Sequence, residues 1–140
     1  MTQVYDEVVT HGTHRAGVHE LVRAVEQGTV RLAALNDSNI INHVRQPSEE
    51  IPAVSDVDLL VLALAQEQRA ILLTDDNTLR LLAAANGIPV IGSIGILVRA
   101  RLDGVIPALK PVLDQLVQSG FYLDPQGHVY REALQRVGEG

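Results

Sequence analysis

The sequence predicts an α/β fold in which helices pack on a parallel sheet, and two observations lead to this prediction. The chain has 140 residues, is 46% hydrophobic, and contains one phenylalanine and no tryptophan. Its core must therefore consist of leucine, valine, isoleucine and alanine, the usual filling of helices on a parallel sheet. Helix-type and strand-type patterns also alternate between Ser55 and Gly92, as in a βαβ unit.

The N-terminal third is predicted to be mainly helical. Residues 1–9 form a short helix, and residues 15–27 form a second helix that Gly28 stops. Thr29–Leu35 is a short β-type run. Asn36–Pro52 is polar, contains two prolines, and is interpreted as a loop with at most one helical turn.

The middle of the chain carries the clearest pattern. A strongly apolar helix is expected from Ser55 to about Gln68, followed by a buried strand at Ala70–Thr74. A helix from about Asn77 to Asn86 should end at Gly87, a favourable residue after a helix C-terminus, and Pro89–Gly92 should be a brief second strand.

The C-terminal third is predicted to be helical. Expected helices cover Ser93–Leu102, Ala108–Ser119 and Gln126–Val137, with Pro107 at the start of the second. No repeat, low-complexity tract or linker interrupts the chain. Because its length suits one core, residues 1–140 are interpreted as a single domain.

Composition excludes several classes of protein. The absence of cysteine excludes disulfide frameworks, thiolate nucleophiles and thiolate zinc sites. No apolar run approaches the roughly 18 residues that span a bilayer, and the N-terminus lacks the basic region of a signal peptide. We therefore expect a cytoplasmic protein with no membrane partner. The formal charge of −6 argues against general adhesion to nucleic acid but permits a local site.

Asp75 and Asp76 follow the first predicted strand directly, where ligands bind in open parallel sheets. Two carboxylates at this point can hold a hard divalent cation such as Mg²⁺. The alternative for each residue is that it caps the helix beginning near Asn77, because aspartate is a good N-cap.

Other acidic residues can join Asp75 and Asp76 only if the fold brings them to the end of the first predicted strand. Asp58 can join the strand end if its helix packs antiparallel to the strand, although Ser55 and Asp58 also resemble a capping box. Asp6 and Glu7 are adjacent on a helix and diverge by about 100°, so only one of them can face a shared centre. Exposure to solvent is the alternative for both.

The histidines His11, His14 and His19 invite comparison with a metal site. His11 and His14 flank a predicted helix break at Gly12, and no zinc-ligand pattern follows them. A solvent-exposed loop explains them better. The sequence also contains no nucleophile elbow, phosphate-binding Walker loop or dinucleotide-binding glycine fingerprint.

The order and spacing of several segments resemble the PIN-domain fold. More narrowly, they resemble a prokaryotic family of predicted PIN-like nucleic-acid-binding proteins related to VapC-type toxins. The similarity covers nearly the whole chain and is weakest between Asn36 and Ala53. The segments that carry it are Val4–Val9, Val54–Leu59, Leu62–Ala65, Ile71–Asp76, Gly87–Leu97, Gly104–Pro107 and Leu113–Phe121.

The resemblance implies a three-layer α/β/α fold with a central parallel sheet, and a Mg²⁺- or Mn²⁺-dependent endoribonuclease that hydrolyses single-stranded or structured RNA. The resemblance also implies that the protein forms a homo-oligomer. Members of the related toxin families often act as the toxin of a toxin–antitoxin pair, in which case an antitoxin protein would be its partner. Carried over by position, the catalytic acids would be Glu7, Asp58 and Asp76, and these three with Asp75 would hold the metal. Arg80 would contact phosphate, with solvated surface as its alternative.

The sequence departs from the family in two places. Family members begin with a strand bearing an aspartate, before the helix with which this sequence starts, and the glycine usual before the Asp58 position is Val57. We therefore expect a sheet without the first strand of the family. An upstream start codon, a second chain, or a degenerate copy would each account for this. The alternative function is a non-catalytic binding or assembly module with a degenerate acidic centre.

Overall fold

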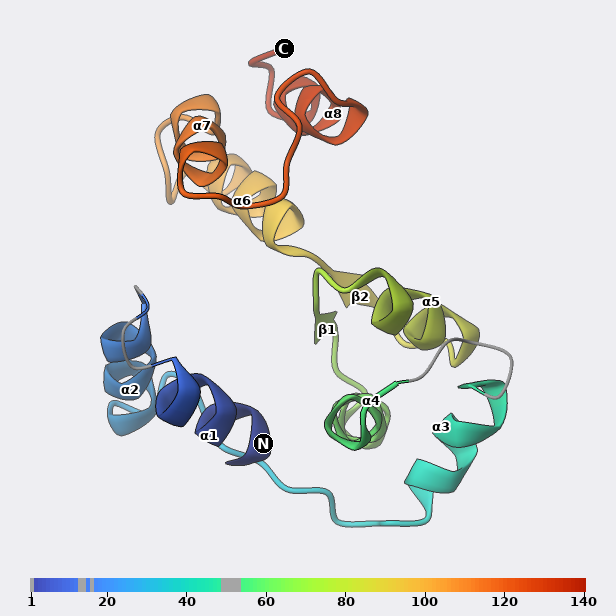
Figure 1. Ribbon diagram of the computed structural model, residues 1–140. Coiled ribbons are helices and arrows are strands. Elements are labelled where there is room, and N and C mark those ends of the chain that lie inside the picture. The colour runs from blue at the N-terminus through green and yellow to red at the C-terminus, as the bar shows by residue number, and fades with distance from the viewer. Residues whose placement is uncertain (1, 13–14, 16, 49–53) are drawn as a thin grey trace. The chain divides into compact units, whose positions relative to one another are not determined.

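The computed structural model describes residues 2–12, 15, 17–48 and 54–140. These residues form helices and a small parallel sheet, which confirms the α/β class (Figure 1). None of the helices in these ranges is both long and apolar enough to cross a bilayer. In chain order the elements are α1 (Thr2–His11), α2 (Val18–Glu26), α3 (Ile40–Ser48), α4 (Asp56–Gln68), β1 (Leu72–Leu73), α5 (Asn77–Ala85), β2 (Val90–Ile91), α6 (Ser93–Leu102), α7 (Lys110–Gln118) and α8 (His128–Arg136).

The chain divides into two compact units, which are described separately. The first unit comprises residues 1–72 and 76–90, and the second comprises residues 73–75 and 91–140. The core of the first unit is built around α4, whose apolar residues are distributed around much of the helix. Its buried residues come from α3, α4, β1 and α5, with one more just before β2: Val44, Leu59, Leu62, Ala63, Ala65, Leu72, Leu79, Leu82, Ala83 and Ile88.

The first two helices lie where the sequence predicts them, but the strand expected after them does not form. Gly28 has a φ of 78° and ends α2 in the left-handed conformation that glycine adopts without strain. The N–H of Val30 then donates to the carbonyl of Ala24 in α2. Thr29–Leu35 belongs to no strand in the described chain, because strand propensity is effective only where a partner strand is available.

The polar segment that follows contains more helix than predicted. The loop assignment for Asn36–Pro52 is wrong over α3, while residues 49–52 lie outside the described ranges. Asp37 turns the chain by accepting the N–H of Asn39 at 2.9 Å. The carboxylate of Glu67, on α4, accepts the N–H groups of Asn36 and Asp37. This long-range anchor precedes a helix whose apolar residues pack on the first core.

The two strands pair in parallel through short ladders. The N–H of Leu72 donates to the carbonyl of Pro89 at 2.8 Å, and that of Thr74 donates to the carbonyl of Ile91 at 3.0 Å. The predicted buried strand at Ala70–Thr74 is shorter and less buried than expected. Leu72 is 4% exposed, but Ile71 and Leu73 are 65% and 56% exposed. Side chains alternate along a strand, and only the Leu72 face contributes to the first core.

The second unit consists of α6, α7 and α8 around their own core, in yellow to red in Figure 1. Its buried residues are Val98, Leu109, Leu113, Tyr130, Ala133 and Leu134. The hydroxyl of buried Tyr130 donates to Asp114, and this hydrogen bond raises the pKa of the tyrosine. Lys110, one turn before Asp114, donates to the same carboxylate at 2.8 Å and lowers its pKa. The hydrogen-bonded carboxylate thus joins α7 to α8.

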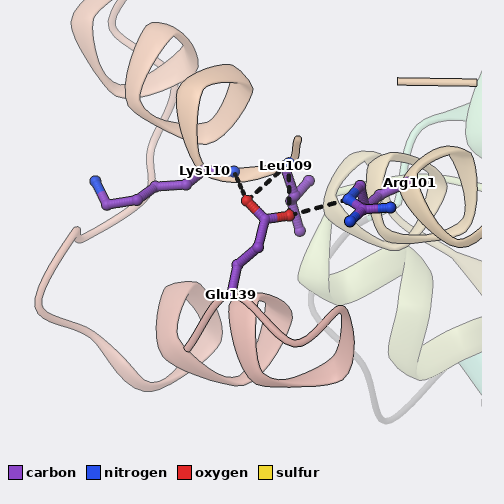
Figure 2. A network of polar contacts seen from close by, with 4 residues as sticks. All are labelled: Arg101, Leu109, Lys110 and Glu139. Atoms are coloured by element: carbon purple, nitrogen blue, oxygen red, sulfur yellow. Dashed lines mark hydrogen bonds and ion pairs between the residues drawn. The ribbon is translucent and has the colours of Figure 1, made fainter. Parts of the chain in front are cut away.

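Glu139 fixes the start of α7 from the other end of this unit, as Figure 2 shows. Its carboxylate accepts the backbone N–H of Leu109 at 2.8 Å and that of Lys110 at 3.1 Å, and pairs with the Nε of Arg101 at 3.2 Å. The helix therefore begins at Lys110 with a proline in its first turn, rather than at Ala108 after Pro107 as predicted. A carboxylate satisfies N–H groups that lack partners inside the helix and interacts favourably with its dipole.

The Glu139 contacts predict a pH-dependent stability of the second unit. The N–H groups of Leu109 and then Lys110 hold the pKa of Glu139 below its usual value of about 4.5. Because the pKa is lower in the folded state, the stabilisation is complete above the unfolded pKa and is lost as the pH falls through the folded pKa. We expect Glu139→Gln to lower the melting temperature at pH 7. The difference from wild type should shrink in thermal melts below about pH 4.5.

Glu132→Gln is the matched control for this substitution. Glu132 also lies in the second unit, but its partners are Arg136 and His128 in exposed pairs on the same helix. Exposed pairs of this kind contribute little to stability. A melting temperature at pH 7 that is equal for Glu139→Gln and wild type would contradict the assigned role of Glu139.

Candidate acidic site

Asp76 lies three residues after the end of β1 and forms the N-cap of α5. Its backbone is extended, with φ −72° and ψ 120°, and its Oδ1 accepts the N–H of Leu79 at 2.8 Å. The capping role considered from the sequence is therefore present. It does not exclude a ligand role, because a carboxylate has two oxygens with about four lone-pair positions. The side chain is exposed at the carboxyl end of the strand.

Asp75 has a different partner from its neighbour. Its Oδ1 accepts the backbone N–H of Ser93 at 2.8 Å, and its Oδ2 accepts the Ser93 hydroxyl at 2.5 Å. Ser93 is the first residue of α6, which follows β2, and the N-cap of that helix is Gly92, which has no side chain to cap with. Asp75 therefore caps α6 from the end of the neighbouring strand instead of capping α5.

Asp58 lies in the first turn of α4. Ser55 is the N-cap of this helix, and its Oγ accepts the N–H of Asp58 at 3.1 Å. This is the serine half of the capping box that the sequence predicts. The Asp58 carboxylate is half-buried and makes no hydrogen bond to the residues that the structure describes, so its oxygens retain their capacity to bind a ligand.

Glu7 is exposed on α1 and lines a hollow of about 430 Å³ beside the start of α2. His11, one turn along the same helix, and Arg15 also line it. Asp6 is exposed as well. His11 is the last residue of α1 rather than part of a loop, and His19 is exposed on α2, whereas His14 lies outside the described residues.

Arg80, the predicted phosphate contact, is exposed on α5. Its backbone N–H donates to the carbonyl of Asp76 at 2.9 Å, so it lies one turn after the cap. This position puts a guanidinium on the helix that begins at the candidate site. Arginine binds phosphate through two parallel hydrogen bonds, which suits the predicted role.

The described residues do not gather three acidic, histidine or cysteine side chains into one metal-binding cluster. Asp58 and Asp76 belong to the first unit with Glu7, and Asp75 belongs to the second. The chemistry of the donors nevertheless fits Mg²⁺ or Mn²⁺. All four predicted ligands are carboxylates, which suit hard divalent cations.

Comparison with protein families identifies the chain. A family model described as DUF3368: PIN domain matches residues 2–139. The chain belongs to this PIN-domain family. PIN domains have a nuclease-like fold and generally depend on divalent metal ions. No curated protein and no solved structure matches the sequence significantly. The family assignment confirms the resemblance that the sequence motifs indicate.

The sequence did not single out Ser93, which contacts a predicted ligand of this PIN domain. The sequence could have indicated this contact, because Asp75 and Ser93 each come shortly after one of the two neighbouring parallel strands. The carboxyl ends of such strands meet at one edge of a sheet. A hydroxyl placed after the second strand could therefore have been paired with the acids after the first.

Proposed function

We propose that this PIN domain is a Mg²⁺- or Mn²⁺-dependent endoribonuclease. The family match over residues 2–139 carries the proposal, because it covers every predicted acid. The exposed carboxylates of Asp75 and Asp76 after β1 support it. They occupy the position where ligands bind to parallel sheets.

The finer parts of the proposal follow from the same assignment. Residues 1–140 would form one domain with a three-layer α/β/α arrangement and a central parallel sheet. The protein would act in the cytoplasm on single-stranded or structured RNA, as a homo-oligomer and as the toxin of a toxin–antitoxin pair. An antitoxin protein would then be its partner.

Each residue has a proposed role in hydrolysis. Glu7, Asp58 and Asp76, with Asp75, would supply carboxylate oxygens to the metal, and Arg80 would bind a phosphate of the RNA backbone. When bound, the metal would supply a nucleophile from water at neutral pH and neutralise charge on the scissile phosphate. The caps on α4 and α5 hold the backbones of Asp58 and Asp76 at helix starts, which limits the positions that these carboxylates can take.

Cleavage of labelled RNA by the purified full chain tests the proposal. We expect products from single-stranded or structured RNA with Mg²⁺ or Mn²⁺, and none with EDTA. Glu7→Gln should abolish cleavage, whereas Glu26→Gln, at an exposed glutamate on α2, should not. A folded protein that cleaves no RNA with either metal would contradict the proposal. It would favour the alternative of a non-catalytic module, which predicts stable oligomers or complexes with a partner.

A further inference from the structure

The hollow at the junction of α1 and α2 is lined by charged side chains that include two basic ones. It measures about 430 Å³, and Glu7, His11 and Arg15 line it together with two valines and two glycines. All of these residues belong to the first unit. The volume lies in the range of about 300–1,000 Å³ that is typical of small-ligand sites, so the hollow can take a group as large as one nucleotide.

Local backbone contacts bring Arg15 back to the end of α1. The N–H of buried Gly12 donates to the carbonyl of Val8 at 3.0 Å, and a Cβ on this residue would lie 2.4 Å from that oxygen. Only glycine fits this close approach. The N–H of Arg15 then donates to the carbonyl of Gly12 at 2.8 Å, so the chain turns directly after α1. Because Glu7 and His11 are four residues apart and share one helix face, all three charged side chains meet at the hollow.

The two basic side chains of the hollow are exposed and form no ion pair with any residue that the structure describes. The guanidinium of Arg15 presents a planar fork of donors that matches a phosphate, and the His11 imidazole has at least one N–H donor. Of the described residues that line the hollow, Glu7 alone is acidic. Most basic residues of the second unit, in contrast, already pair with carboxylates: Arg99, Arg101, Lys110 and Arg136.

We infer that this hollow binds a phosphodiester group of the RNA substrate, with Arg15 and His11 as the residues that contact the phosphate. The inference rests on the proposed function. Phosphate contacts fix the register and orientation of a nucleic acid without reading its sequence. Since Glu7 lines the same hollow, these contacts would hold the RNA backbone beside a proposed catalytic acid. A local site of this kind would let a chain with a formal charge of −6 bind RNA.

The experiment measures binding of a labelled single-stranded RNA to the full chain by fluorescence anisotropy, in EDTA so that no cleavage occurs. We expect Arg15→Ala to weaken binding about 10-fold and to reduce the slope of log affinity against log salt by about 0.7. His11→Ala should weaken binding less, since an imidazole offers fewer donors. Arg23→Ala is the matched control, because Arg23 is exposed on α2 and does not line the hollow. It should change neither quantity.

Glu7→Gln should have the opposite effect to Arg15→Ala in this assay. Without metal, removal of a negative charge beside the phosphate should strengthen RNA binding roughly threefold. Glu26→Gln, at an exposed glutamate of α2 outside the hollow, should leave the affinity unchanged. A general loss of structure would weaken binding in both variants, so the opposite signs separate a phosphate contact from a structural role.

Three results would overturn the inference: a wild-type chain that binds no RNA in EDTA, an Arg15→Ala variant with wild-type affinity and salt slope, or a Glu7→Gln variant that binds more weakly than wild type. Failure of the proposed function has a different result. A chain whose RNA binding depends on Arg15, but which cleaves no RNA with Mg²⁺ or Mn²⁺, would overturn the nuclease proposal and leave the phosphate site standing.

Discussion

Asp76→Asn is expected to abolish metal-dependent RNA cleavage while leaving the fold intact. Asparagine is as good an N-cap as aspartate, and its side-chain oxygen can still accept the N–H of Leu79. It loses the negative charge and one of the two oxygens that a divalent cation prefers. If Asp76 contacts the metal as proposed, its loss should matter more than the loss of a residue that only holds a ligand, so activity should fall by at least about 100-fold.

Asp76→Ala separates the observed capping role of this residue from its proposed role as a metal ligand. Alanine removes the cap as well as the proposed ligand, and the loss of the cap should cost about 1 kcal/mol of stability. Cleavage rates and urea denaturation should be measured on both variants. We expect both to be inactive and only the alanine variant to be clearly destabilised. An asparagine variant that retains wild-type cleavage would show that Asp76 is a cap and nothing more.

Leu62→Ala and Leu113→Ala are expected to have the largest effects on stability. Both leucines are fully buried, Leu62 in the core of the first unit and Leu113 in that of the second. Truncation of a buried leucine leaves a cavity and typically costs about 2–5 kcal/mol. Leu102→Ala is the control, because this leucine of α6 is 59% exposed and should change stability by less than about 0.5 kcal/mol.

The same pair of variants tests whether residues 1–140 behave as one domain. Hydrogen exchange resolved by segment reports the opening of each unit separately. If the chain unfolds cooperatively, Leu62→Ala should accelerate exchange in the slowest amides of α7 as well as in α4 and α5. Acceleration confined to the first unit would instead identify two units that unfold independently.

The parts that the sequence predicted correctly depend on interactions within about one helical turn. Ser55 caps α4 and Asp76 caps α5 through residues three positions away, and Gly28 ends α2 by its own backbone freedom. Such signals are present in any short stretch of chain. The position of Asp75 and Asp76 after a strand was predictable for the same reason.

The parts that only the tertiary structure decided depend on residues far apart in the sequence. Glu67 anchors the segment before α3, Glu139 sets the start of α7 across about 30 residues, and Ser93 holds Asp75. Thr29–Leu35 has strand propensity but belongs to no strand in the described chain. Long-range hydrogen bonds and strand pairing require the chain to fold back on itself. No local pattern of residues specifies which distant partner will be met, and so these features emerge only in the folded protein.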